Sequence, residues 1–147
     1  MTGNTMSYTL SPEMAVSRDR DIPATVQQAW AALPAVYEKL GLSVTAYDSA
    51  SHTIVGERLR TRRDFGSRQL RSVVDCGDIA GVPAVDRYEI NLKVRTVIER
   101  AGQASAIRSM VDATAKPSAV SGELMRCTVK EGVADEVAST LAAMVQS

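Results

Sequence analysis

The chain contains few of the residues from which catalytic and metal sites are usually built. Its 147 residues include one His, two Cys, one Trp and one Phe. Because a structural zinc site usually takes four Cys or His ligands, His52 and two thiols are too few to form one. No GxSxG or CxxC motif occurs in the chain. The sequence therefore predicts no metal site, no cofactor and no catalytic residue set.

An excess of one charge is also absent. Seventeen Lys and Arg residues balance seventeen Asp and Glu residues, so the formal net charge is zero. This balance argues against a general role in binding nucleic acid or anionic membranes. Aromatic residues make up only 4% of the chain, too few for platforms on which single-stranded bases stack. No nucleic-acid partner is expected.

The sequence shows neither a membrane span nor an export signal. No run approaches the ~18 apolar residues that cross a bilayer, so no transmembrane segment is expected. Residues 1–10 lack the basic and then apolar layout of a signal peptide. Either the protein is cytoplasmic or a leader was removed ahead of this sequence.

The two cysteines, Cys76 and Cys127, bear on whether the protein is cytoplasmic or exported. A disulfide between them would close a long loop and stabilise the fold by about 4 kcal/mol. Two buried free thiols, which behave as small apolar side chains, are the alternative. Counting residues leaves both readings open.

What the sequence does contain is regular alternation of apolar and polar residues over 86–99. Every second position holds one of Tyr88, Ile90, Leu92, Val94, Thr96 and Ile98. Most of the gaps hold Arg87, Glu89, Asn91, Lys93, Arg95 and Glu99. This period of two predicts a long strand with one buried and one solvated face. Such a strand needs a second layer on one side only, so an antiparallel sheet covered by helix on one face is expected.

Shorter patterns predict the other elements. Apolar residues spaced by four, three, four and three indicate an amphipathic helix over about 24–40, which Pro34 should kink or split near Ala31. Strands are predicted over about 6–17, 42–47, 53–62, 69–75, 86–99 and 104–114.

Three further details follow from these patterns. Within 42–47, Leu42, Val44 and Ala46 should share one face. Residues 18–21 are predicted to form a turn. A closing helix is expected from Thr128 on, with a capping box formed by Thr128 and Glu131.

The expected fold class is α+β, with the order strand, helix, five strands, helix. Residues 6–147 are expected to form a single domain after a flexible tail at 1–5, since no repeat or low-complexity linker divides them. The C-terminal helix should lie across one face of a six-stranded antiparallel sheet, an arrangement known as a helix-grip.

The chain resembles uncharacterised bacterial envelope proteins with a helix-grip domain like that of BamC-type outer-membrane lipoproteins. The resemblance rests on the run 26–33 through 40–42, on Asp75-Cys76-Gly77 with 86–88, and on Cys127 before the closing helix. It implies a Cys76–Cys127 disulfide and export to the periplasm or the outer-membrane surface. It also implies a non-enzymatic module that binds a protein or cell-wall partner through its sheet surface or loops.

A second likeness is to the START and Bet v 1 group, whose helix-grip encloses an apolar cavity. It rests on Ile22-Pro23-Ala24 ahead of Val26 and Trp30. It implies the alternative function, a carrier or cavity enzyme for a small apolar ligand. That function requires an internal cavity of several hundred cubic ångströms between the closing helix and the sheet.

Two groups of side chains are candidates for binding. Arg58, Arg60 and Arg62 alternate along one predicted strand, where they could clamp an anion or an acidic partner or simply form a solvated face. Large side chains with polar tips could line a ligand groove or fill the core; these are Trp30, Tyr37 and Tyr88.

His52 is the remaining candidate, as the proton-transfer residue of a hydrolase. It lies in a predicted turn four positions after Asp48. Such a role would need a cleft and a partner within hydrogen-bond reach, and an exposed turn histidine is the alternative reading.

Overall fold

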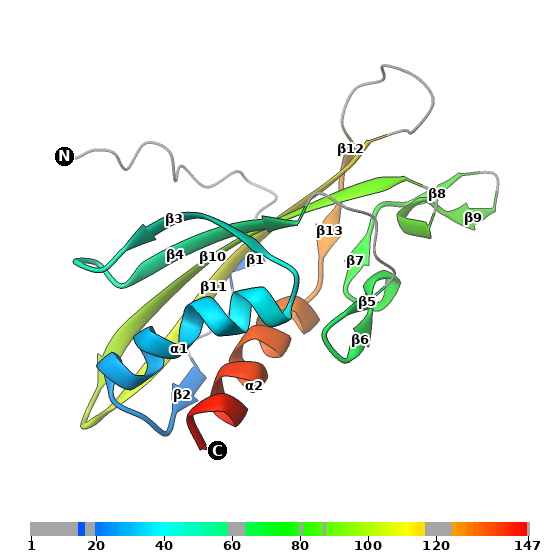
Figure 1. Cartoon of the computed structure of the whole chain (residues 1–147). Coiled ribbons are helices and arrows are strands. Elements are labelled where there is room, and N and C mark those ends of the chain that lie inside the picture. The colour runs from blue at the N-terminus through cyan, green and yellow to red at the C-terminus, as the bar shows by residue number, and fades with distance from the viewer. Residues whose placement is uncertain are drawn as a thin grey trace.

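A computed structural model describes residues 15–16, 20–58, 64–79, 81–86, 88–116 and 125–146. Two helices, α1 (Val26–Lys39) and α2 (Gly132–Gln146), cover one face of a twisted antiparallel sheet (Figure 1). The predicted α+β architecture, with the C-terminal helix packed on the sheet, is confirmed.

Within the described residues the main sheet has seven strands, in the order β1-β11-β10-β4-β3, with β2 and β12 also paired to β11. Its strands are β1 (Ala15–Val16), β2 (Arg20–Ile22), β3 (Ser43–Asp48), β4 (Thr53–Arg58), β10 (Glu89–Ala101), β11 (Ala104–Lys116) and β12 (Met125–Arg126). The shorter elements are β5 (Asp64–Phe65), β6 (Arg68–Gln69), η2 (Leu70–Ser72), β7 (Val74–Asp75), β8 (Asp78–Ile79), β9 (Val82–Pro83), η3 (Ala84–Asp86) and β13 (Thr128–Val129).

The long hairpin β10–β11 confirms the alternation on which the fold prediction depended. Its two strands pair from Glu89 opposite Lys116 to Ala101 opposite Ala104. The helix-side positions of β10 are buried: Ile90, Leu92, Val94, Thr96 and Ile98. The intervening side chains from Asn91 to Val97 are half-buried on the opposite face.

Helix α1 begins at a capping box in which the Thr25 hydroxyl accepts from the Gln28 amide and the Gln28 side chain accepts from the Thr25 amide. The helix runs without a break through Pro34, so the predicted split near Ala31 is wrong. Pro34 is exposed, while Leu33 and Tyr37 on either side of it are fully buried. Packing against the sheet on both sides of the proline holds the helix together despite the lost donor.

The predicted strand over 69–75 is wrong. Its residues form β6, the 3-10 turn η2 and β7, and they lie outside the main sheet, where β7 pairs with β13. The buried residues are Leu70, Val73 and Val74, a spacing that suits a helical turn better than a strand. Because this segment leaves the sheet, β10 pairs directly with β4.

Two other boundaries differ from the predictions. Arg20–Ile22, expected to be partly turn, is strand β2 along the end of β11. Thr128–Val129 is strand β13, so the capping box of Thr128 and Glu131 is wrong and α2 begins at Gly132. The pairing of β13 with β7 holds Thr128 extended and delays the helix start. The predicted strands 6–17 and 53–62 lie partly outside the described residues. Their described parts contain β1 and β4.

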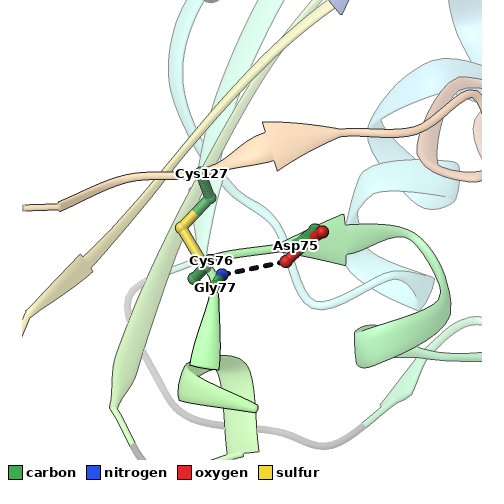
Figure 2. The surroundings of a disulfide bond; sticks show 4 residues. All are labelled: Asp75, Cys76, Gly77 and Cys127. Atoms are coloured by element: carbon green, nitrogen blue, oxygen red, sulfur yellow. Dashed lines mark hydrogen bonds between the residues drawn. A yellow bond between two sulfur atoms is a disulfide. The ribbon is translucent and has the colours of Figure 1, made fainter. Parts of the chain in front are cut away.

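The disulfide implied by the family resemblance is present. Cys76 and Cys127 are bonded, and both are buried with exposed fractions of 5% and 2% (Figure 2). The Cys127 amide donates to the Ala113 carbonyl of β11, and the Asp75 carboxylate accepts from the Gly77 amide. The bond therefore ties the segment between β4 and β10 to the strand that leads into α2.

A buried carboxylate makes a second link between that segment and α2. Glu136 is 8% exposed and accepts from the Ser67 amide at 2.8 Å, the Ser67 hydroxyl at 3.0 Å and Arg68 Nε at 3.3 Å. The Arg68 side chain is 43% exposed, so its ion pair is screened by solvent and contributes little. Of the three donors, the backbone amide of Ser67 makes the shortest hydrogen bond to Glu136.

Glu136→Ala is expected to lower the free energy of unfolding by about 1–3 kcal/mol, because it leaves the Ser67 amide without its acceptor. Urea denaturation measures the loss, and hydrogen exchange should show faster exchange of the Ser67 amide. Ser67→Ala is the matched control, since it removes only the hydroxyl donor and should cost less than half as much. Equal losses in the two variants would contradict the role given to the backbone amide.

Candidate functional site

The arginines predicted to bind an anion do not form an exposed clamp as far as the structure describes them. Arg58 is 4% exposed, and its guanidinium lies 5.7 Å from the centre of the Phe65 ring. Arg58 follows the helix-side register of β4, opposite Leu92, so its side chain points into the interior. Arg60 and Arg62 lie outside the described residues.

The three large side chains predicted to line a groove lie in different surroundings. Tyr37 is fully buried, and a Cβ added at Gly56 would lie 2.7 Å from its ring, so the space between α1 and the sheet is filled there. Tyr88 is half-buried against the core. Trp30 alone of the three belongs to a cluster that reaches the surface, described below.

That cluster lies at the free edge of the sheet, which we call the β3 rim: strand β3 together with Trp30 and His52. Strand β3 ends the sheet, and among the described residues no strand pairs with its outer side. Five of its six residues are exposed, and Ala46 is half-buried. Figure 1 shows β3 at the margin of the sheet, beside β4.

A β-bulge in β3 decides which side chains face the helices. The strand pairs Val44 with Gly56 and Ala46 with Val55, so Thr45 is the extra residue. Val44 and Tyr47 lie opposite Gly56 and Ile54, which are two positions apart and therefore share the helix side. The expectation that Val44 and Ala46 share a face is wrong, because the bulge shifts the alternation by one residue.

The bulge aims the two exposed large apolar side chains of the described structure toward the same side. Val44 is 45% exposed and Tyr47 is 47% exposed. The Tyr47 ring stacks on Trp30 of α1, with centroids 4.4 Å apart and planes inclined by 18°. Tyr47 therefore covers Trp30 with one face and leaves its other face to solvent.

His52 completes the rim but lacks the features of a catalytic histidine. Its ring meets Trp30 edge-on at 5.4 Å, and its backbone has a φ of 51°, the left-handed conformation of a tight turn. The Asp48 carboxylate accepts from the Ala50 amide at 3.0 Å. Hydrogen bonds from the Ser51 side chain and the Ala50 backbone lower the pKa of Asp48. The Asp48 side chain thus stabilises the turn that follows β3.

Potential metal ligands do not cluster in the described part of the chain. No group of three or more His, Cys, Asp or Glu side chains in that part of the chain is placed to hold a metal ion. Two surface hollows of about 420 and 460 Å³ do occur. The first lies between the start of α1 and the β10–β11 turn, and the second lies between the end of α1 and α2.

Comparison with known proteins adds little to this picture. No protein-family model and no curated protein matches the chain. A crystal structure of a DUF4468 family protein from Bacteroides ovatus is similar over 99% of this chain and 90% of that chain, at 10% identity and a TM-score of 0.38. Among the described residues no helix is both long enough and apolar enough to cross a membrane.

Sequence reasoning singled out Trp30 and His52 of the β3 rim and missed Val44 and Tyr47. Trp30 was predicted from its helical spacing and its amphipathic ring. Tyr47 and Val44 were assigned to opposite faces of a regular strand, so their convergence was not predicted. The signal that could have found them is the absence of Lys, Arg and Pro from 43–48, which is unusual for a strand at a sheet edge.

Proposed function

We propose that this protein is a non-enzymatic interaction module of the cell envelope, of the BamC-like type, which binds a protein partner at the β3 rim. The observation that carries the proposal is the exposure of Val44 and Tyr47 on one side of an edge strand. Sheet edges offer unpaired amide and carbonyl groups, and an extended chain of a partner is the ligand that pairs with them.

The disulfide supports the proposed location. Disulfides persist in oxidising compartments such as the periplasm and are rare in the cytosol. The Cys76–Cys127 bond is buried and links two parts of the fold, as structural disulfides of exported proteins do.

The exposed side chains and the open strand edge of the β3 rim favour a protein partner over a small apolar ligand. The two apolar side chains flank an open strand edge, and the Tyr37 ring fills the space between α1 and the sheet near Gly56. The cavity expected of a ligand carrier would lie between α2 and the sheet, where Val133, Val137 and Leu141 are fully buried in the core. An extended peptide needs only the edge and alternate side-chain contacts.

Val44→Asp is expected to weaken partner binding at least ten-fold, because it places a charge on the apolar side of the rim. Native mass spectrometry of the protein purified from its own host, followed by titration of the companion it retains, measures the effect. Hydrogen exchange should show slower exchange of the amides of 43–48 in the complex. Val44 is 45% exposed, so the variant should fold normally.

Ala35→Asp is the matched control, since Ala35 is exposed on α1 and lies outside the β3 rim. It should bind the companion as the unaltered protein does. A companion that binds both variants equally, or that leaves exchange at 43–48 unchanged, would refute the proposed site.

A further inference from the structure

We infer that the partner strand at the rim is β3 of a second copy of this chain, so that two sheets join edge to edge about a two-fold axis at Ala46. This inference rests on the proposed function, because it uses the same rim. It adds the identity of the partner and the register of the contact.

The register follows from the bulge. The β3 residues that pair with β4 are Ser43, Val44, Ala46, Tyr47 and Asp48. Ala46 is the middle of the five, so an antiparallel copy centred on it places Val44 opposite Tyr47 of the second copy. The same operation repeats this pair on the other side of the axis.

The paired side chains are chemically compatible at every position. Val44 and Tyr47 share the helix side of the sheet, so each pair of one valine and one tyrosine buries apolar surface that is now exposed. Ala46 is small and stands opposite its own copy, where it does not hinder the approach of the backbones. Ser43 stands opposite Asp48, a hydroxyl beside a carboxylate, so no like charges face each other.

The bulge favours a second copy over an unrelated strand. A bulge increases the local twist of a strand, so a partner strand with the same local twist pairs better with this edge than a flatter strand does. A second β3 carries the same bulge at the symmetric position and matches that twist. Within the described residues the other side of the sheet is less open, because β11 already pairs there with β1, β2 and β12.

The first test is the oligomeric state of the unaltered chain. Sedimentation velocity over a range of concentrations up to about 1 mM should show a species of twice the 15.7 kDa chain mass, whose share rises with concentration. Val44→Asp should shift the midpoint of this transition to at least ten-fold higher concentration. A chain that sediments as a monomer throughout would overturn the inference.

The second test checks the register. Ala46→Lys and Ala46→Glu should each abolish the dimer, because two like charges then face each other across the axis. An equimolar mixture of the two variants should restore a heterodimer. Ser43→Lys is the matched control: it adds the same side chain to the same strand, but it faces Asp48 of the second copy and should tighten the dimer.

The outcomes separate this inference from the proposed function. A monomeric chain that holds a different companion, lost on Val44→Asp, would overturn the inference and leave the proposed rim standing. A dimer that Ala46→Lys does not affect would overturn the stated register. A monomer with no companion that slows exchange at 43–48 would overturn both.

Discussion

Replacing both cysteines, as Cys76→Ala with Cys127→Ala, is expected to lower the free energy of unfolding by about 4 kcal/mol. The bond closes a loop of 51 positions, and its removal restores the conformational freedom of that loop in the unfolded chain. Such a loss is a large part of the ~5–15 kcal/mol that stabilises an ordinary domain. Urea denaturation of the oxidised protein and the double variant measures it.

The unaltered chain unfolded in the presence of a reductant is the matched control. It should lose nearly as much stability as the double variant, since both lack the bond and differ only by two small buried side chains. Hydrogen exchange should rise first in β7 and β13, which the bond holds together. A loss below about 1 kcal/mol in both experiments would mean that other contacts hold the segment in place.

The parts of the fold that sequence reasoning predicted are those in which local pattern and tertiary packing agree. Strand β10 alternates because one of its faces lies under the helices, and α1 repeats every three to four residues because one of its sides lies on the sheet. Both elements are long enough for the pattern to repeat several times. The Cys76–Cys127 pairing came from the family resemblance, since residue counting alone left it open.

The segment between β4 and β10 was mispredicted because its conformation depends on distant contacts. Its strands are two residues each, too short to show any period. Phe65, Leu70 and Val74 are buried in the common core, so tertiary packing sets the path of the backbone. Glu136 on α2 also holds the turn at Ser67, and no residue near Ser67 in the sequence predicts that contact.

The candidate site was only partly predictable for a similar reason. Thr45 is an ordinary strand residue, and no glycine or proline marks it as the bulge. The bulge shows only in the pairing of β3 with β4, where Val44 and Ala46 lie opposite the neighbouring residues Gly56 and Val55. Since that one-residue shift moves Tyr47 onto Trp30, the site is a consequence of pairing and could not be read from the local sequence.

The second large effect concerns Tyr37, whose side chain joins α1 to the middle of the sheet. Its hydroxyl donates to Thr96 Oγ1 at 2.7 Å, and Thr96 in turn lies 3.1 Å from the Ser109 hydroxyl. All three side chains are buried. These three hydroxyls therefore form a buried hydrogen-bonded chain from α1 through β10 to β11.

Tyr37→Ala is expected to lower the free energy of unfolding by about 3–5 kcal/mol, because it leaves a cavity the size of the ring. Tyr37→Phe, the matched control, keeps the ring and should cost about 1–2 kcal/mol for the hydrogen bond to Thr96. Urea denaturation of the three proteins separates packing from hydrogen bonding. Equal losses in the two variants would contradict the view that the ring supplies most of the stabilisation.

The pH dependence of stability provides an independent check on the buried phenol. Burial raises the pKa of Tyr37 well above its usual range, and the hydrogen bond to Thr96 offsets only part of that rise. The Tyr37 phenol of the unfolded chain ionises near pH ~10, whereas that of the folded chain stays neutral. The stability that the neutral, buried phenol contributes is therefore complete below pH ~10 and is lost as the pH rises beyond it. Tyr37→Phe has no phenol at this position and should lose less stability than the unaltered protein between pH 9 and 11. If the free energies of unfolding of the two proteins fall equally over that range, Tyr37 is not a buried phenol that stays neutral in the folded chain.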